Sequence, residues 1–343
     1  MNPLTHALES FPQRSLSAEE SAAAVGWIMD GQASEVEIAA LLTGWAVRGE
    51  TAEELAGAAT AMRERAVRIP TSRRGLLDTC GTGGDRLRTF NISTAAALTA
   101  AAAGVPVAKH GNRKATSTTG SADVLEELGI RVELSPEVVG ACVDEIGIGF
   151  CFARILHGAM KYVAPIRAKL PFRTIFNLLG PLTNPAQAEF QVIGTHRLET
   201  AELLAQTVQR LGTSRTLIVC GNGELDEVAL WGQTQVLEVT AAGIRHDVWT
   251  PERLGLSTVR VADLQVDTAA ASAAVLKSVF HGDTGPARDM VLANTAAAFY
   301  AAGRVTDPAR GVALAAATID SGAVTELLNR LAAKTNFDGH FGV

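Results

Sequence analysis

The chain has 343 residues, of which 47% are hydrophobic and 19% are charged, and this composition is ordinary for a globular protein with a sizeable core. The length suggests two domains, or one large domain with a small partner. The formal net charge of -6 argues against a general nucleic-acid-binding protein, because such proteins usually carry a basic surplus. A local basic patch that binds phosphate remains compatible with this charge.

The four cysteines are widely spaced and form no C-x-x-C pair, so the sequence shows neither a disulfide framework nor a zinc pattern. The amino terminus has no positively charged region followed by an apolar core, which a signal peptide would require. Apolar stretches such as residues 95–107 are too short to span a bilayer. We therefore expect a cytoplasmic protein without membrane or nucleic-acid partners.

Residues 1–72 carry the same helix start signal three times. In the S/T-x-x-E capping box, a hydroxyl and a carboxylate satisfy backbone amides at a helix start. The three matches are Ser17 with Glu20, Ser34 with Glu37, and Thr51 with Glu54. Gly31 and Gly49 fall where the first two helices should end. The pattern predicts a small helical domain that packs against the rest of the chain or a second subunit.

From Leu76 onward, strand-like and helical stretches alternate. Strands are expected at Leu76–Thr79, Val105–Lys109, Arg131–Leu134, Ile148–Phe152, Gln191–Gly194 and Thr216–Gly221. Helices are expected from about Ile92 to Gly104, from Ser121 to Gly129, from Ser135, at Leu198–Leu211, and through the alanine-rich residues 267–331. This rhythm predicts an α/β domain over residues 73–335, with a mostly parallel central sheet flanked by helices. Residues 336–343 are expected to form a short disordered tail.

The segment from Ile146 to Ala188 contains no acidic residue. Its basic residues are Arg154, Lys161, Arg167, Lys169 and Arg173, and its prolines are Pro165, Pro171, Pro181 and Pro185. We expect short helices and turns that cross back toward the helical domain, so that part of residues 165–188 joins it. The basic residues would then form a wall over the ligand edge of the sheet.

The loop Gly81-Thr82-Gly83-Gly84 follows the first expected strand. It is not a Rossmann fingerprint, because Arg86 stands where the third glycine is required, and no P-loop motif occurs. The glycines allow backbone amides to approach a ligand, and the helix start at residues 91–94 adds free amides suited to an anion. The alternative is a tight strand-to-helix turn without a ligand.

A second loop, Lys109 to Lys114, places three cations within six residues at another strand end, and residues 116–119 add four hydroxyls. Such a cluster is favourable when it faces an anion such as phosphate. The alternative is a solvated charged loop.

Adjacent acids, Asp226 and Glu227, follow a third strand end and offer oxygen ligands. Magnesium is usually held by one or two carboxylates plus substrate phosphates and water, and Ser93 would supply another oxygen. The alternative is an ordinary surface pair. Arg167 is suited to grip a carboxylate with two hydrogen bonds, unless it is a simple surface charge. His157 and His196 have no partners at metal-ligand spacing, and we assign them no role.

Several motifs together resemble the anthranilate phosphoribosyltransferase family over nearly the whole chain. They are GTGGD at 81–85, NIST at 91–94, KHGNR at 109–113, GSAD at 120–123, AMKYVAPIR at 159–167, RTIFNLLGPLTNPA at 173–186, and the pair at 226–227. The resemblance implies a small helical domain that forms a homodimer, joined to a larger α/β domain of the nucleoside-phosphorylase type. It also implies transfer of the phosphoribosyl group from phosphoribosyl pyrophosphate to the amine of anthranilate in tryptophan biosynthesis.

The resemblance also implies roles for individual residues. Magnesium should be bound by Ser93, Asp226 and Glu227, and anthranilate should contact Gly81, Asn112 and Arg167. The donor should be held by Gly81, Gly84, Asp85, Thr89, Asn91, Ile92, Ser93, Thr94, Lys109, His110, Gly111, Asn112, Arg113, Lys114, Ala115, Thr116, Ser117 and Ser121. No side chain is expected to act as a general acid or base, because an aromatic amine is neutral at pH 7.

Three residues depart from the family pattern: Gly158 replaces proline, Pro171 replaces glycine, and Lys114 replaces a small residue. The first two lie on the acceptor side. Two other functions remain open on the sequence alone. A pyrimidine nucleoside phosphorylase shares the fold, although KHGNR and the acidic pair fit it poorly. A non-catalytic protein that binds a phosphoribosyl ligand or nucleic acid would be expected to have lost the metal pair or the donor loops, and both are intact.

Overall fold

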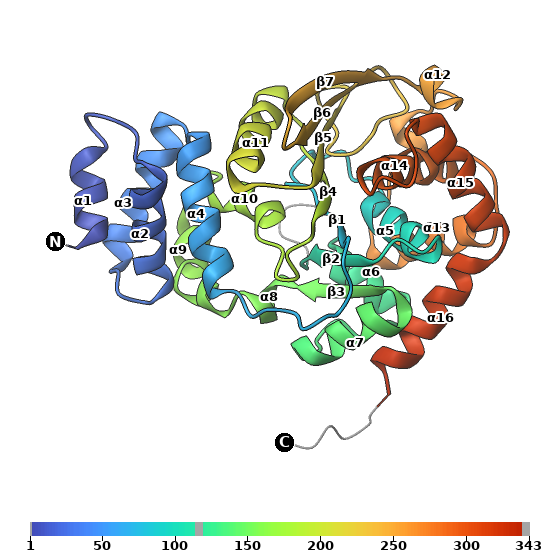
Figure 1. Cartoon of the computed structure of the whole chain (residues 1–343), viewed down its shortest axis with the longest axis horizontal. Helices are drawn as coiled ribbons and strands as arrows, with labels where there is room; N and C mark the ends of the chain where they lie inside the picture. Colours follow the sequence, from blue (N-terminus) through green and yellow to red (C-terminus); the bar gives the residue numbers. More distant parts are fainter. Residues whose placement is uncertain (1, 114–118, 338–343) are drawn as a thin grey trace.

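The structure, a computed structural model, describes residues 2–113 and 119–337. A bundle of four helices begins the chain and lies beside a larger α/β body (Figure 1). Its helices are α1 (Pro3–Ser10), α2 (Ala18–Met29), α3 (Glu35–Arg48) and α4 (Ala52–Arg65). The helix α1 has no capping box, and the side chain of Asn2 caps it instead. The sequence analysis did not predict this helix.

All three predicted capping boxes are present, at the starts of α2, α3 and α4. In each, the N-cap hydroxyl accepts a hydrogen bond from the third helical amide, and the glutamate side chain at that position accepts one from the N-cap amide. Gly31 and Gly49 adopt positive φ values of 72° and 86° where α2 and α3 end. The sequence therefore predicted these helix boundaries from local chemistry.

The central sheet has seven strands in the order β3-β2-β1-β4-β5-β6-β7. Its first five strands are mutually parallel, and β6 and β7 are antiparallel. The strands are β1 (Leu77–Thr79), β2 (Val107–Gly111), β3 (Ile148–Phe152), β4 (Phe190–Gly194), β5 (Arg215–Gly221), β6 (Thr234–Thr240) and β7 (Gly243–Trp249). The predicted fold class, helical domain plus mostly parallel α/β domain, is confirmed.

Two details of the predicted sheet are wrong. Residues 131–134 form no strand: Val132 is buried in the core, but the Arg131 amide donates to Thr335 Oγ1 instead of to a neighbouring strand. The hairpin of β6 and β7 was not predicted, and Thr234–Thr240 does not show the alternation of a half-buried strand, because four consecutive residues, 236–239, are buried.

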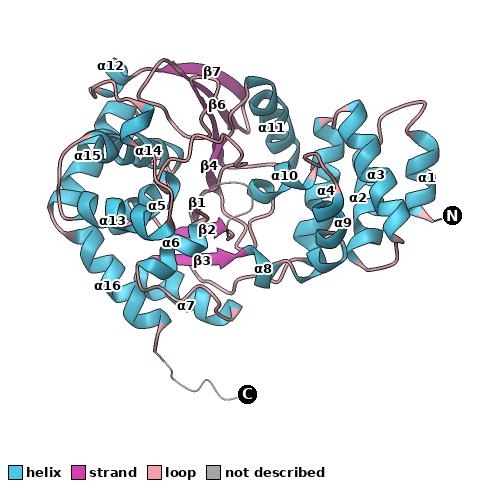
Figure 2. Cartoon of the chain, turned by 180° about the vertical axis from the view of Figure 1, so that it is seen from behind, coloured by secondary structure: helices cyan, strands magenta, loops and turns pink. Residues whose placement is uncertain are grey.

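Helices cover both faces of the sheet. Successive residues of β4 and β5 point to opposite faces, so Val192 and Leu217 join one apolar core while Ile193 and Ile218 join another. Figure 2 shows α5 and α13–α16 on one side, and α11 with the helical bundle on the other. The remaining helices are α5 (Ile92–Ala102), α6 (Ser121–Glu127), α7 (Pro136–Ile146), α11 (Leu198–Leu211), α12 (Pro251–Leu254), α13 (Ala269–Phe280), α14 (Pro286–Ala301), α15 (Pro308–Asp320) and α16 (Ala323–Thr335), with a 3₁₀ turn at Val261–Asp263.

The acid-free segment forms short helices between the two bodies: α8 (Ala153–Leu156), α9 (Ala164–Lys169), α10 (Phe176–Leu179), and 3₁₀ turns at Gly158–Tyr162 and Gly180–Leu182. Val163 and Ile166 are buried in the same core cluster as Trp45 of α3. Lys169 pairs with Glu35 of α3, at 3.1 Å from Nζ to Oε2. The segment therefore runs back against the helical bundle.

No single helix in the described part of the chain is long and apolar enough to cross a membrane. The bent pair α15 and α16 reaches the required length and composition only when the two are taken together.

Candidate functional site

A cavity of about 750 Å³ opens where β1, β2 and β5 end. Parallel strands bring their carboxyl ends to one edge of a sheet, and ligands bind there in such folds. Most of the residues predicted for the site line this cavity: Gly81, Gly84, Asp85, Thr89, Asn91, Ile92, Ser93, Lys109, His110, Gly111, Asn112, Arg113, Ser121, Arg167, Asp226 and Glu227. Lys114, Ala115, Thr116 and Ser117 lie outside the described residues.

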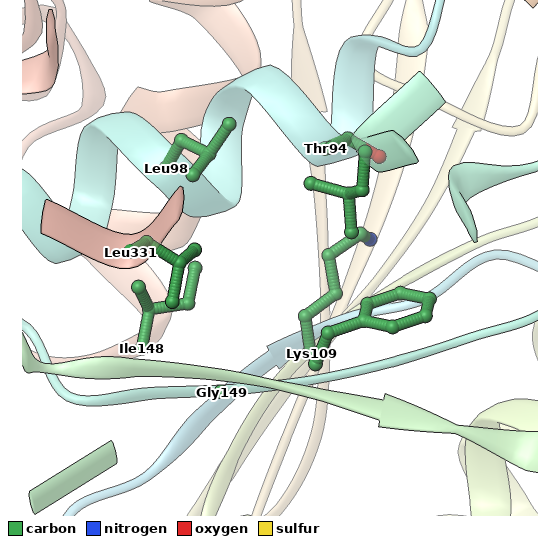
Figure 3. A pocket seen from close by; sticks show the side chains of 8 residues that line it. Thr94, Leu98, Lys109, Ile148, Gly149 and Leu331 are labelled. Carbon is green, nitrogen blue, oxygen red and sulfur yellow. The ribbon is translucent and has the colours of Figure 1, made fainter. Parts of the chain in front are cut away.

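Thr94 does not line this cavity. Its side chain is buried and faces a separate space of about 10 Å³, which it shares with Leu98 and the stem of Lys109 (Figure 3). The residue follows Ser93 on α5, and one step along a helix turns a side chain by about 100°. The structure therefore places Thr94 in the core behind the site.

The glycine-rich loop is held in shape from both sides. Gly83 and Gly84 have φ values of 64° and 91°, which glycine adopts without strain. The Thr82 amide donates to the Gly194 carbonyl at 2.8 Å. On the other side, Arg173 donates to the carbonyls of Gly83 and Thr82 at 3.1 and 3.2 Å. A side chain at Gly84 would displace the Arg173 guanidinium from the loop, because its Cβ would lie 1.9 Å from Arg173 Nη1.

Two of the backbone amides expected to be free for an anion are occupied by carboxylates. The Gly83 amide donates to Asp226 Oδ2 at 2.8 Å, and the Ser93 amide at the start of α5 donates to Glu227 Oε1 at 3.1 Å. Helix starts attract negative charge, so Glu227 itself satisfies the start of α5. The acidic pair and the two amide-rich elements thus meet at one point.

The charge of Asp85 acts on the buried carboxyl groups of Asp226 and Glu227. Burial, and then the charges of Asp85 and Glu227, raise the pKa of Asp226 well above its ordinary value. Burial is also the main cause that raises the pKa of Glu227 to about 7, against the opposing charge of Lys109. Burial and neighbouring negative charges make the ionised forms of these carboxyl groups unfavourable, and a divalent cation between them offsets that cost. A set of oxygen ligands suits Mg²⁺. The residues present therefore fit magnesium.

Lys109 lies between the first loop and the helix α5. Its buried ammonium donates to the Thr79 carbonyl at 2.6 Å and lies 3.4 Å from Ser93 Oγ. This position places a positive charge near Glu227, which accounts for the opposing effect on the pKa of that carboxyl group.

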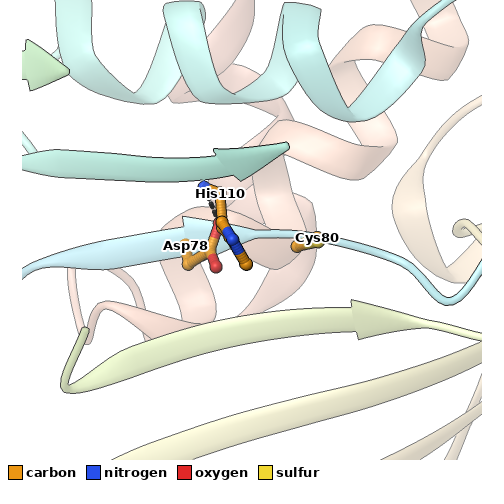
Figure 4. Close-up of side chains that lie close together, drawn as sticks. All are labelled: Asp78, Cys80 and His110. Atoms are coloured by element: carbon orange, nitrogen blue, oxygen red, sulfur yellow. Dashed lines mark hydrogen bonds between the residues drawn. The ribbon is translucent and has the colours of Figure 1, made fainter. Parts of the chain in front are cut away.

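His110 belongs to a buried hydrogen-bond network at the base of the cavity (Figure 4). Its backbone amide donates to Asp78 Oδ1 at 2.9 Å, and its ring nitrogen Nδ1 donates to the Gly180 carbonyl at 3.0 Å. The other ring nitrogen lies 3.2 Å from Nε2 of His157, to which the sequence analysis assigned no role. Burial lowers the pKa of His110 to about 4 and of His157 to about 3, so both rings are neutral at pH 7.

Asp78, Cys80 and His110 also bring one ligand atom each within 4.8 Å of the others. Both Asp78 oxygens already accept hydrogen bonds, from His110 and from Asn184 Nδ2. Burial raises the pKa of the Cys80 thiol, which keeps it protonated. A thiol binds a metal as the thiolate, so this group is better explained as structural.

Arg113 and Arg167 occupy different environments. The Arg113 guanidinium is paired with Glu126 of α6 at 2.7 Å and also contacts Asp123 and Glu133. Arg167 forms no ion pair in the described ranges and lies 5.5 Å above the Phe176 ring, with its pKa lowered by burial. Arg113 therefore ties its loop to α6, and Arg167 presents an unpaired charge to the cavity.

The expected basic wall is formed by two of its five residues. Arg167 lines the cavity and Arg173 contacts its loop, whereas Arg154 is exposed outside the cavity lining, Lys161 stacks over Tyr162 and Lys169 pairs with Glu35. Arg173 was missed as a loop contact, because no local signal links it to carbonyls 90 residues away. Gly158, which departs from the family pattern, has open space beside it: an added Cβ would meet nothing within 4 Å.

Comparisons with known proteins agree with this geometry. Residues 73–325 match the α/β domain of the glycosyl transferase family, and residues 8–66 match its helical bundle domain. The chain is 48% identical to the anthranilate phosphoribosyltransferase of Symbiobacterium thermophilum over 318 residues, which covers 93% of each protein. It is 46% identical to that of Desulforamulus reducens over 316 residues, which covers 92% of each.

Solved structures of these enzymes superpose closely. The anthranilate phosphoribosyltransferase of Thermus thermophilus gives a TM-score of 0.91 at 43% identity, covering 98% of this chain and 99% of that one. The Saccharomyces cerevisiae enzyme in complex with PRPP and Mg gives 0.89 at 26% identity, covering 97% of each.

Proposed function

The chain belongs to the anthranilate phosphoribosyltransferase family, and from this premise we propose that it transfers the phosphoribosyl group of phosphoribosyl pyrophosphate to the amine of anthranilate, in tryptophan biosynthesis. The observation that carries the proposal is the meeting of the glycine-rich loop, Lys109 and the acidic pair at one cavity. A donor with a pyrophosphate needs amides, a cation and a metal site together, and the cavity offers all three.

The donor lies along the glycine-rich loop, the start of α5 and the loop after β2. This proposal covers the predicted donor residues that line the cavity and the four that lie outside the described residues. It leaves out Thr94, because its side chain faces the core. Arg113 acts on the donor through the position of its loop, since its guanidinium is paired with α6.

Magnesium is held by Asp226 and Glu227, with Ser93 beside them. Bound there, the ion neutralises charge on the pyrophosphate leaving group, which is usually a large part of catalysis in such reactions. Within the chain, Lys109 adds a fixed positive charge to the same region. The Gly83 and Ser93 amides, which donate to these carboxylates, would be free for the donor if the carboxylates bound the ion instead.

Anthranilate lies between Arg167, Asn112 and Gly81, with its carboxylate facing Arg167. The unpaired guanidinium is suited to a bidentate contact with a carboxylate. The amine attacks as a neutral group, so the chain needs no strong base, and the neutral rings of His110 and His157 are consistent with this. Holding the amine close to the ribose carbon supplies much of the remaining rate.

The helical domain is proposed to span residues 1–72, with part of residues 165–188 added, and the α/β domain residues 73–335. We also propose a homodimer through α3, because that helix exposes an apolar stripe. Val36 and Val47 are 79% and 83% exposed, and the exposed Ala40 and Thr43 lie between them on the same face. A cytoplasmic location remains a prediction.

A fluorescence assay of anthranilate consumption tests the reaction. The protein should consume anthranilate only with both the donor and Mg²⁺ present, and Arg167→Ala should raise KM for anthranilate about tenfold or more. Lys169→Ala is the matched control. It also removes a cation from α9, but the Lys169 side chain pairs with Glu35. Well-folded protein that binds the donor without consuming anthranilate would contradict the proposed acceptor.

A further inference from the structure

Four basic side chains gather beside the glycine-rich loop, outside the proposed donor set. Arg86 lines the cavity, Arg173 contacts the Gly83 carbonyl, and His196 and Arg197 follow the end of β4. The groups lie close enough to act on one another: burial is the main cause that lowers the pKa of Arg173, the charge of Asp226 opposes this, and the charges of Arg197 and Arg86 lower the pKa further. Arg86, Arg173, His196 and Arg197 are here called the cationic rim.

No carboxylate pairs with the cationic rim among residues 2–113 and 119–337. Arg173 donates to backbone carbonyls, and Arg86 and Arg197 form no ion pair in that part of the chain. The Nδ1 atom of His196 is buried without a hydrogen-bond partner. Like charges held together repel one another, and a bound anion removes this repulsion. Asp226, whose charge acts on Arg173, belongs to the proposed metal site, and Asp85, whose charge acts on His196, belongs to the proposed donor set.

Arg86 is held in a strained backbone conformation. Its φ of 64° lies in the left-handed region, which glycine adopts freely and which is costly for other residues. Strain of this kind is concentrated at functional sites. Arg88 has a similar φ of 58°, but its guanidinium is paired with Asp267 at 2.9 Å. Arg86 thus combines strain with an unpaired charge at the cavity.

Resting on the proposed function, we propose that the cationic rim is a further binding site for the pyrophosphate group, with Arg86 as its principal contact. The rim adjoins the glycine-rich loop and the metal-binding carboxylates, where the most negative part of the donor lies. Guanidinium groups match phosphate oxygens in a two-pronged contact. The rim therefore binds pyrophosphate both within the donor and as the product that leaves.

The variant Arg86→Gly tests the cationic rim, because it should weaken pyrophosphate binding without lowering the stability of the protein. We expect KM for phosphoribosyl pyrophosphate and the inhibition constant of pyrophosphate to rise about tenfold, while KM for anthranilate stays unchanged. The melting temperature should stay the same or rise, since glycine removes the strain. Arg197→Gln should show a smaller rise in the same two constants.

Gln187→Gly is the matched control. Gln187 has a similar φ of 56° but does not line the site cavity, so its variant should change the melting temperature alone. An Arg86→Gly protein with both constants of the parent would overturn the proposal.

Calorimetric titration with inorganic pyrophosphate and Mg²⁺ separates this proposal from the proposed reaction. Weaker pyrophosphate binding by Arg86→Gly supports the rim even if the parent consumes no anthranilate. Equal binding by parent and variant overturns the rim even if the parent is fully active.

Discussion

The carboxylate of Asp226 accepts a hydrogen bond from the backbone amide of Gly83, 143 residues earlier in the chain, at 2.8 Å. A side chain proposed to bind metal thus also fixes the loop proposed to bind the donor. Glu227 does the same for the start of α5 through Ser93. Metal and donor binding are therefore expected to depend on each other.

Magnesium should stabilise the protein more strongly as the pH rises from 6 to 8. The pKa of Glu227 is raised to about 7, so the folded state binds its proton more tightly than the unfolded state. The stability from this proton is fully present below about pH 4.5 and is lost as the pH rises through 7. Mg²⁺ binds the ionised form, and at a hundred times Kd a ligand stabilises by about 2.7 kcal/mol.

Thermal unfolding with Mg²⁺ and with a chelator, at several pH values, measures this effect. Glu227→Gln removes one of the two titrating carboxylates and should reduce the pH dependence of the magnesium shift, with Asp226 supplying the rest. A shift that is the same at pH 6 and pH 8 in the parent would contradict the role of Glu227.

Gly81→Ala should abolish most activity while leaving the fold intact. A Cβ at this position would lie 2.7 Å from Asp226 Oδ2 and displace the carboxylate. A misplacement of about 1 Å in a catalytic site costs about a hundredfold in rate. Gly158→Ala is the control, because its Cβ meets nothing within 4 Å, and it should behave like the parent. Steady-state kinetics and circular dichroism on both variants give the answer, and an active Gly81→Ala enzyme would contradict the predicted clash.

Asp78→Asn should lower the free energy of unfolding by about 2 kcal/mol. Both carboxylate oxygens of this buried side chain accept hydrogen bonds, from His110 and Asn184, and an amide would turn a donor toward one of them. Denaturation by urea measures the change. Asp267→Asn, at a side chain that is 78% exposed, should change stability by less than about 0.5 kcal/mol. If Asp78→Asn were as stable as Asp267→Asn, the predicted cost of placing an amide in this hydrogen-bond network would be wrong.

Local sequence patterns predicted the helix starts and turns, but they did not predict contacts between segments that are distant in the sequence. The capping box of Ser17 and Glu20 and the turn at Gly83 need only neighbouring residues, so the sequence predicted them. The grip of Arg173 on the Gly83 carbonyl joins segments that only the folded chain brings together. Val132 looked like part of a strand because it is apolar, but it fills the core without a strand partner.

The same limit applies inside the site. The motif around Thr94 predicted a run of donor contacts, but the helical turn of α5 points that side chain into the core while its neighbour Ser93 faces the cavity. The pairing of Arg113 with Glu126 was equally hidden, because α6 approaches the loop only in the fold.

Val47→Glu should convert the proposed dimer into a monomer. Val47 is 83% exposed at the end of the apolar stripe on α3, and a buried, unpaired carboxylate in a subunit interface is strongly unfavourable. Sedimentation velocity at micromolar concentration measures the change in mass. Val67→Glu is the control, because Val67 is also exposed, at 47%, but lies beyond α4. The monomeric variant should keep most of its activity, since no residue of α3 is among the described residues that line the cavity. A parent protein that sediments as a monomer, or a Val47→Glu variant that remains dimeric, would rule out α3 as the interface.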